Sequence, residues 1–307
     1  MTTALISSRR KNLRKARKGL KIALLTIWAG LFAVLFLLPT VLTITNSFMS
    51  SGEITANYGA VFATGESGGK QFIAERVNLK FIPDKVTLKQ YITVLFKSPD
   101  YLLKFWNALI LTAPIVIFQT IVALIASYGF ARYQGRFRNM LFFMYIVLML
   151  MPYQVTLVPN YLVSKWLGTL NTRWAIILPG IFSPFAVFIL TKCMRRIPKS
   201  FIEAAKLDGA NEWQIFTKIC VPSCKNAIYS VVILVFIDYW NMVEQVLILL
   251  SDKEKQPLSV FLSEINSGEI SLAFAVACIY MIPAIFLFLY GEEYLLDGIN
   301  YSGGLKG

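Results

Sequence analysis

The sequence predicts an all-α, polytopic membrane protein with six transmembrane helices. Apolar residues make up 56% of the 307 residues, and the mean hydropathy is +0.60, above that of soluble globular domains. Six segments offer about 20 mostly apolar residues each, the length that crosses a bilayer as a helix. Helices are expected rather than strands because period-two alternation is absent and backbone groups in lipid must be paired within the segment.

Five of the predicted spans contain no charged residue and cover residues 22–44, 105–131, 140–164, 174–191 and 272–290. The remaining span, 227–250, is fifth in chain order and contains Asp238 and Glu244. Proline removes a helix hydrogen bond, so kinks are expected at Pro39, Pro114, Pro152, Pro159, Pro179, Pro184 and Pro283. The pattern therefore predicts six helices, several of them bent.

Basic residues are concentrated before the first span. The chain has 30 Lys and Arg against 17 Asp and Glu, and segment 1–21 carries Arg9, Arg10, Lys11, Arg14, Lys15, Arg17, Lys18 and Lys21. Positive charge resists translocation, so this segment is predicted to be a basic cytoplasmic tail, with no nucleic acid as its partner. The first apolar run lacks a small-residue cleavage site after it and is expected to remain as a span.

The same orientation assigns the rest of the chain. Residues 45–104 are expected to form an extracytoplasmic loop, and residues 105–298 a transmembrane domain that includes a cytoplasmic loop at 199–222. Residues 299–307 would be a cytoplasmic tail. Both termini are then cytoplasmic, and the chain is predicted to be a multi-pass protein of the cell membrane.

The composition argues against catalysis by this chain. There is no His, which removes Ser-His-Asp and Cys-His nucleophiles and His-ligated metal sites. The four cysteines form no C-x-x-C pair. The segment 65–70, GESGGK, is not a phosphate loop, because Gln71 stands where Ser or Thr must bind magnesium. We expect no catalytic residue, no metal site and no cofactor bound by this chain.

The polar segment 199–222 is predicted to fold as a two-helix hairpin. Ser200 and Glu203 have the spacing of a capping box, which would start a helix over 201–208. Gly209 follows and can adopt the left-handed conformation that ends a helix. One face of this helix would carry Phe201, Ala204, Ala205 and Asp208. Phe201 and Ile202 are expected to project as apolar contacts for another protein.

The second helix of the hairpin has its own start and stop signals. Asn211 and Gln214 repeat the capping spacing, and the helix is predicted to run toward Ile219 and stop near Pro222. Small side chains on the first helix would let another surface approach closely. The alternative is an amphipathic hairpin that lies on the inner membrane face.

The spacing Glu203-Ala204-Ala205, three residues, Gly209, nine residues, Ile219, one residue, Val221-Pro222 resembles the cytoplasmic coupling loop of ATP-binding-cassette importer permeases. Segments 127–138 and 151–170 are similar to parts of the carbohydrate-uptake branch of that family. The glycine-rich ending 303–307 resembles the tail of the maltose-type permease subunit. The resemblance covers about residues 80–307.

The resemblance implies a permease subunit, not an enzyme, in an ATP-driven sugar importer. Its partners would be a second permease subunit in a heterodimer, two ABC ATPase subunits that hydrolyse ATP, an extracytoplasmic solute-binding protein and the sugar. The implied ATPase-coupling residues are Ser200, Phe201, Ile202, Glu203, Ala204, Ala205, Asp208, Gly209 and Ala210. The implied ATPase-contacting tail residues are Gly303, Gly304 and Lys306.

Polar residues in the fifth span are candidates for the substrate pathway: Asp238, Tyr239, Trp240, Asn241 and Glu244. A carboxylate in hydrocarbon is costly, so Asp238 and Glu244 should face a partner or a wet cavity. Amides and carboxylates could bind sugar hydroxyls while aromatic rings stack on the sugar. Alternatively, Asp238 pairs within the subunit interface and Glu244 reaches the outer surface.

A different class of protein also fits these carboxylates. A self-sufficient secondary transporter or channel could use Asp238 or Glu244 to couple ions. Such proteins usually contain internal repeats and unwound spans near the midplane. The two halves of this chain show no detectable repeat. A membrane enzyme is a third class, for which the sequence offers no nucleophile and base pair.

Overall fold

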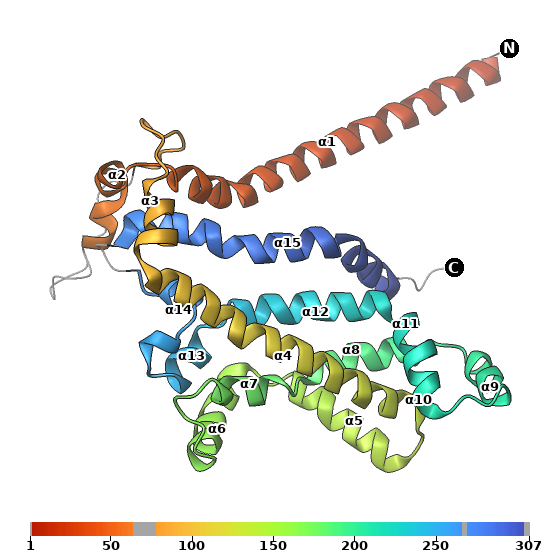
Figure 1. The fold of residues 1–307 in the computed structure, drawn as a ribbon. Helices are drawn as coiled ribbons and strands as arrows, with labels where there is room; N and C mark the ends of the chain where they lie inside the picture. Colours follow the sequence, from red (N-terminus) through yellow and green to blue (C-terminus); the bar gives the residue numbers. More distant parts are fainter. Residues whose placement is uncertain (1, 64–77, 266–268, 304–307) are drawn as a thin grey trace. The chain divides into compact units, whose positions relative to one another are not determined.

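The computed structural model describes residues 2–63, 78–265 and 269–303, with side chains described over 18–58, 78–265 and 269–294. The regular elements in these ranges are helices, as the all-α prediction requires. The chain divides into two compact units (Figure 1). Unit 1 comprises Met1–Ile92 and Asn266–Cys278, and unit 2 comprises Thr93–Ile265 and Ile279–Gly307.

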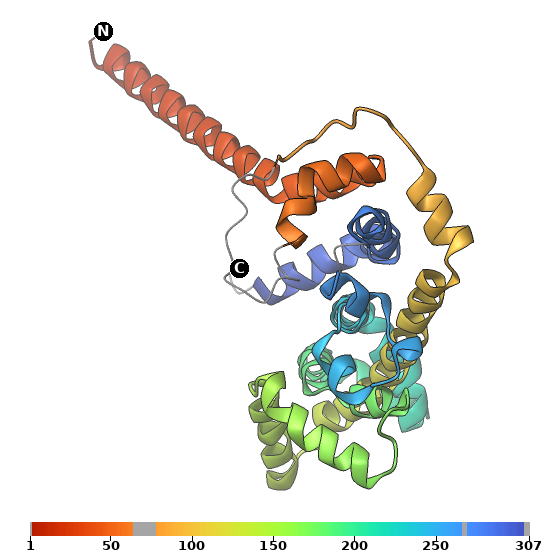
Figure 2. The same ribbon diagram turned by 90° about the vertical axis from the view of Figure 1, so that its left-hand side faces the viewer.

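Unit 1 is built around a long first helix. α1, Thr2–Asn46, is an uninterrupted helix of 45 residues despite Pro39 (Figure 2). Its segment Lys18–Asn46 is long and apolar enough to cross a membrane and contains the predicted span 22–44. Leu, Ile, Val and Phe side chains along it are exposed, as expected for a helix that contacts lipid.

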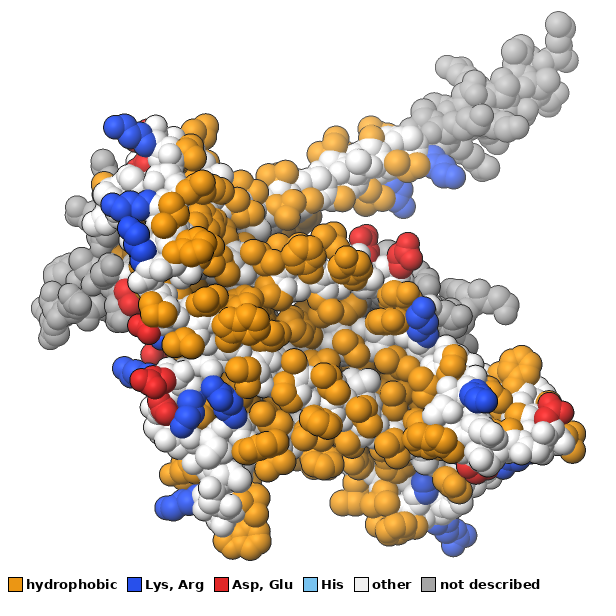
Figure 3. Space-filling view, viewed as in Figure 1, with side chains coloured by type: hydrophobic (Ala, Val, Ile, Leu, Met, Phe, Trp, Pro, Cys, Tyr) orange, Lys and Arg blue, Asp and Glu red, His pale blue; other side chains and the backbone are white. Residues whose placement is uncertain are grey.

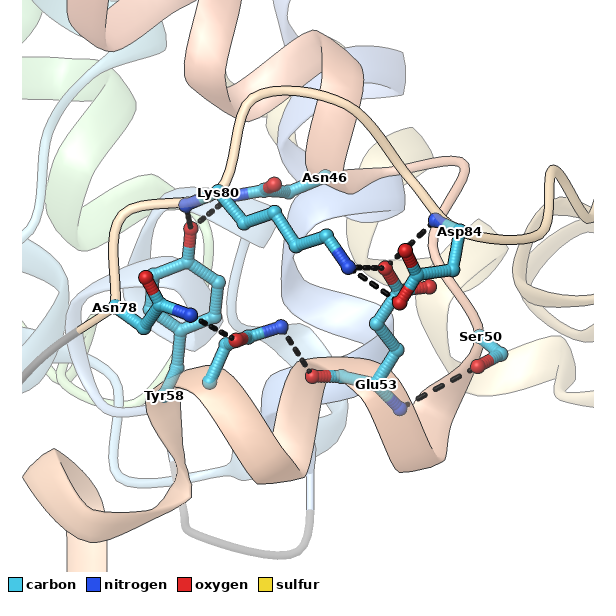
Figure 4. A network of polar contacts seen from close by, with 8 residues as sticks. Asn46, Ser50, Glu53, Tyr58, Asn78, Lys80 and Asp84 are labelled. Atoms are coloured by element: carbon cyan, nitrogen blue, oxygen red, sulfur yellow. Dashed lines mark hydrogen bonds and ion pairs between the residues drawn. The ribbon is translucent and has the colours of Figure 1, made fainter.

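The predicted outer loop 45–104 contains helices of its own. They are α2, Ser51–Ala63, the short α3, Lys89–Ile92, and a π turn, Thr93–Lys97. Residues 78–84, here called the strap, lie along α2 (Figure 4). Lys80 forms ion pairs with Glu53, at 2.9 Å, and with Asp84. The segment 65–70 lies outside the described residues.

Two further groups of hydrogen bonds hold the strap. The Asp84 amide donates to Oε1 of Glu53 at 2.8 Å, and Asn78 donates to Asn57 on α2 at 3.1 Å (Figure 4). The Tyr58 hydroxyl accepts from the Lys80 amide of the strap at 3.4 Å and from the Asn46 side chain at 2.8 Å. The hydrogen bond from the Asp84 amide and the ammonium of Lys80 hold the pKa of Glu53 below its usual value.

Acid should release the strap from α2. Because the pKa of Glu53 is lowered by folding, its contribution to stability is present above the ordinary carboxyl pKa and is lost as the pH falls through the lowered value. We expect the Asp84 amide, corrected for intrinsic exchange, to lose hydrogen-exchange protection at acidic pH, and Glu53→Gln to lose it already at neutral pH. The Ile54 amide, bonded to Ser50 O within unit 1, is the control. Full protection of Asp84 in Glu53→Gln at neutral pH would contradict this account.

Unit 2 contains the remaining helices around a core of three. α4, Pro99–Arg132, packs against α8, Pro184–Met194, and α12, Lys225–Trp240. The buried contacts between them are made by Val116, Ala123, Ala186, Val187, Leu190, Val231 and Val235. Around them lie α5, Arg136–Met149, α6, Tyr153–Trp166, α7, Trp174–Gly180, α13, Glu244–Leu249, α14, Leu258–Ser263, and most of α15, Ile270–Gly303.

The outer surface of unit 2 has the character of a lipid-facing surface. On the face over α4, hydrophobic side chains predominate and charged side chains gather toward the two ends (Figure 3). Exposed apolar residues of α4 include Ile110, Ile117, Phe118, Ile121 and Ile125. Such a patch on a water-soluble protein would be exceptional, because apolar surface in water is costly.

Four helices in the described residues can cross a membrane by length and composition. They are Lys18–Asn46, Pro99–Arg132, Trp174–Met194, which combines α7 and α8, and Ile270–Tyr294. Two strongly bent helix pairs would raise the number to six if each pair is one span. The predicted tail 299–307 is helical as far as Gly303, where α15 ends.

The predicted third span, 140–164, is not a continuous helix. α5 and α6 meet at 105°, and the break falls at 150–152. Pro152 has no amide hydrogen, and its extended backbone, with ψ 140°, starts α6 in a new direction. A prediction from composition could not show this, because residues 140–164 contain no charged residue on either side of the break.

The predicted fifth span, 227–250, is not a continuous helix either. Within it, α12 ends at Trp240. At its other end, before residue 227, the axis of α12 is bent by 74° from the preceding helical segment Glu212–Ser223. The Asn241 side chain donates to Ile237 O at 2.8 Å and pairs a carbonyl of the last turn. After this break, Glu244 opens α13, so Asp238 and Glu244 belong to different helices.

Candidate functional site

The hairpin predicted at 199–222 forms one end of unit 2 (Figure 1). Its first helix is α9, Lys199–Leu207. The second is continuous from α10, Glu212–Ile215, through a π turn, Phe216–Cys220, into α11, Val221–Ser223. The second helix therefore ends close to the predicted stop at Pro222.

The predicted capping box of Ser200 and Glu203 was wrong. The N-cap of α9 is Pro198, whose backbone is extended at φ −57° and ψ 135°, and no side chain caps the helix. Because Pro198 already has the conformation that precedes a helix, the first turn begins at Lys199. Ser200 then lies inside the helix, two residues past the N-cap position.

The Gly209 joint and the second cap are confirmed. Gly209 has φ +81°, in the left-handed region. Its amide donates to Lys206 O at 3.1 Å, and the Ala210 amide donates to Ala205 O at 2.9 Å, which is the Schellman pattern. Asn211 accepts from the Gln214 amide at 2.8 Å, and the Gln214 side chain accepts from the Asn211 amide at 2.9 Å.

Ile202 anchors α9 and does not project from it, in contrast to the prediction. Its side chain is 1% exposed and packs in a cluster with Tyr128, Met194, Ile215, Phe216, Cys220 and Cys224. Phe201 is 61% exposed, as expected for a contact residue. Ala204 and Asp208 are exposed, whereas Ala205 and Ala210 are half-buried against the same cluster.

Sequence reasoning missed two exposed apolar side chains of the hairpin. Leu207 is 90% exposed at the end of α9, and Trp213 is 64% exposed on α10. Leu207 lies five positions after Ile202, about 140° around the helix from the buried face. Its position relative to Ile202 was the signal that could have identified it.

Glu212 is a third functional candidate that the sequence did not reveal. Its Oε1 lies 2.6 Å from Nζ of Lys206 on α9, and its Oε2 accepts from the Tyr128 hydroxyl on α4. The Tyr128 ring packs edge-on against Phe216 at 5.2 Å. The carboxylate thus connects both helices of the hairpin to the membrane helix α4.

Of the predicted tail residues, Gly303 is the last residue of α15. Gly304 and Lys306 lie outside the described residues. Among the described residues, no group of three or more His, Cys, Asp or Glu side chains is placed to hold a metal ion.

The predicted pathway residues lie around the break between α12 and α13. Asp238, Asn241 and Glu244 are exposed, and Tyr239 is half-buried. Trp240 is 1% exposed. Phe236 and Tyr280 stack on its ring, each at 5.3 Å, so its faces are not available to a sugar.

Residues of the other helix break join this polar region. Nε2 of Gln154, near the start of α6, lies 3.4 Å from Glu244 Oε2. Within the described side chains, neither Asp238 nor Glu244 forms an ion pair. The breaks at 150–152 and 241–243 are therefore joined by the contact of Gln154 with Glu244.

An all-helical fold with a lipid-facing surface and a polar hairpin at one end is that of a membrane protein. Residues 119–297 match the family described as "Binding-protein-dependent transport system inner membrane component". This match covers more than half of the chain, which therefore belongs to that family.

Similar proteins include several permeases. The chain is 27% identical to "Arabinooligosaccharides transport system permease protein AraQ" of Halalkalibacterium halodurans, over 92% of this chain and 96% of that protein. It is 31% identical to "Probable ABC transporter permease protein PH1036" of Pyrococcus horikoshii, over 72% and 82%. It is 30% identical to "Melibiose/raffinose/stachyose import permease protein MelC" of Bacillus subtilis, over 66% and 75%.

The fold also resembles solved structures. One is a chain of a bacterial ABC transporter involved in the import of the acidic polysaccharide alginate, with a TM-score of 0.72 and 23% identity over 88% of this chain and 94% of that chain. A second is from a bacterial alginate ABC transporter in complex with a periplasmic protein, with a TM-score of 0.56 and 15% identity over 67% and 81%. At these identities the likeness concerns the fold.

Proposed function

We propose that this chain is the channel-forming permease subunit of an ATP-driven importer of sugars or oligosaccharides. The observation that carries the proposal is the hairpin 199–223, which presents Phe201 and Leu207 to solvent while Ile202 and Glu212 fix it to the membrane helices. Exposed apolar side chains on a rigid, well-capped element suit a protein partner. The relatives named above are permeases, two of them for oligosaccharides.

The partners follow from the same proposal. A second permease subunit completes the pore, and two ABC ATPase subunits bind and hydrolyse ATP at sites outside this chain. An extracytoplasmic solute-binding protein delivers the sugar. The periplasmic protein in one of the similar structures supports this last partner.

The proposed orientation places both termini and the hairpin in the cytoplasm. It can be tested with single cysteines in a variant whose four native cysteines are replaced by serine. A membrane-impermeant maleimide should label Ile82→Cys, a 78% exposed strap position, in intact cells. It should label Leu207→Cys only after permeabilisation. Labelling of Leu207→Cys in intact cells would show that the hairpin is outside the cell and that the proposed topology is wrong.

The function is tested by purification and uptake. A second permease and an ATPase should co-elute with the tagged chain. Proteoliposomes with the complex and its solute-binding protein should take up one of a panel of neutral and acidic oligosaccharides only when ATP is inside. Uptake that follows an ion gradient without ATP would instead favour a secondary transporter that uses Asp238 or Glu244.

Asn241→Ala should lower uptake several-fold while the complex still assembles. Asn241 lies at the break where the pathway is proposed. Its exposed amide donates to Ile237 O and accepts from the Tyr280 hydroxyl, which leaves one N–H and one lone pair that can bind sugar hydroxyls. Uptake kinetics and co-elution check the two parts of the prediction. Asn139→Ala, an exposed amide at the start of α5, is the matched control. Unchanged kinetics in Asn241→Ala would remove Asn241 from the pathway.

A further inference from the structure

Glu212 bridges two elements that belong to different parts of the proposed machine. Its Oε1 pairs with Lys206 on α9, the helix with the exposed apolar side chains, at 2.6 Å. Its Oε2 accepts from the Tyr128 hydroxyl on α4, a helix able to cross the membrane. Residues 84 positions apart in the sequence are thereby joined through one carboxylate.

Both ends of this bridge are held rigidly. Glu212 directly follows the N-cap Asn211, whose capping box with Gln214 fixes the first turn of α10. The Tyr128 side chain is buried, and its ring is fixed by Phe216. The preceding residue of α4, Ser127, donates to Val187 O on α8 at 3.0 Å. Because these contacts are fixed, Glu212 cannot move far without displacing α4 and α8.

The bridge differs in kind from the apolar contacts around it. The cluster that contains Ile202, Ile215 and Phe216 resists compression, but apolar surfaces can slide past one another. Charge-assisted hydrogen bonds are short and directional, and separation would leave the buried Tyr128 hydroxyl without its partner. The bridge can therefore transmit pulling and lateral movement as well as pushing.

We propose that Lys206, Glu212 and Tyr128 form the polar link through which a displacement of α9 is passed to α4. The three residues are positioning residues, since none is placed to contact sugar or nucleotide. This inference rests on the proposed function, in which an ATPase moves α9. The apolar cluster holds the hairpin in place, and the polar link makes α4 follow it.

The test measures whether α9 and α4 move together. Nitroxide labels at Leu207→Cys on α9 and Ile125→Cys on α4, both exposed, report one distance in the assembled complex. In the otherwise wild-type complex we expect a single distance before and after addition of ATP and vanadate. Tyr128→Phe and Glu212→Met should each add a second distance with nucleotide, with a population roughly two- to tenfold above the wild-type background, the range expected for the loss of one hydrogen bond. The nucleotide-free distance should be unchanged.

A double variant and a control make the result specific. Tyr128→Phe combined with Glu212→Met should have no larger second population than Glu212→Met alone, because Glu212→Met already removes the bond that Tyr128→Phe removes. Tyr133→Phe, whose ring is 61% exposed just after α4, should match the wild type. Single distances in all variants, or an additive double variant, would overturn the link. If nucleotide does not change the distance between the two labels in any variant and no ATPase co-elutes with the complex, the proposed function fails instead.

Discussion

Gly209→Val should abolish ATP-driven uptake. Gly209 has φ +81°, a conformation that costs an L residue about 1–2 kcal/mol, and more when the side chain is β-branched. No atom lies within 4 Å of a Cβ built at this position, so the cost comes from the backbone and not from a collision. Since about 1.4 kcal/mol is a factor of ten, the correctly angled hairpin would fall to a minor population. Uptake and ATPase co-elution measure the effect.

The control for this prediction keeps the conformation and changes the side chain. Asn tolerates the left-handed region better than other non-glycine residues, so Gly209→Asn should retain most of the uptake. Gly209→Ala should fall between Asn and Val. Full uptake in Gly209→Val would show that the angle between α9 and α10 is irrelevant to transport.

Ile202→Ala should destabilise the hairpin strongly, whereas Phe201→Ala should not. Ile202 is 1% exposed within the cluster beneath α9, and the loss of a buried aliphatic side chain costs about 2–5 kcal/mol. Phe201 is 61% exposed, so its truncation removes little packing. Hydrogen-exchange protection of the α9 amides should therefore collapse in Ile202→Ala and persist in Phe201→Ala.

The variants Ile202→Ala and Phe201→Ala also distinguish the folding of α9 from the docking of the ATPase. Phe201→Ala should weaken co-elution of the ATPase even though α9 stays folded, because an exposed aromatic at an interface is a common binding hot spot. Ile202→Val, which removes one methylene group, should behave almost like the wild type in both assays. Equal protection in Ile202→Ala and Phe201→Ala would contradict the burial of Ile202.

The parts of the hairpin governed by local rules could be predicted from the sequence. The left-handed Gly209 and the capping box of Asn211 and Gln214 depend on residues within four positions of each other. The Ser200 cap was predicted by the same rule and failed, because Pro198 offered an earlier helix start. Local rules identify the candidates, but competition between neighbouring candidates decides the outcome.

Contacts between distant residues could not be predicted in this way. The burial of Ile202 depends on Tyr128 and Met194, and the Tyr128 contact to Glu212 joins positions 84 apart. Hydropathy located the membrane-spanning stretches, but it could not reveal the break at 150–152, since residues 140–164 contain no charged residue, and it averaged over the polar Asn241 and Glu244 at the break at 241–243. These breaks depend on Pro152 and on the Asn241 side chain.

Site-specific crosslinking tests most directly whether the hairpin is the docking surface for an ATPase. A photoreactive residue at Ala204 or Leu207, both exposed on the hairpin, should capture the ATPase subunit in native membranes. The same residue at Trp166, which is 83% exposed at the end of α6, should not. Capture of no ATPase from either hairpin position, in membranes that show ATP-driven uptake, would contradict the account.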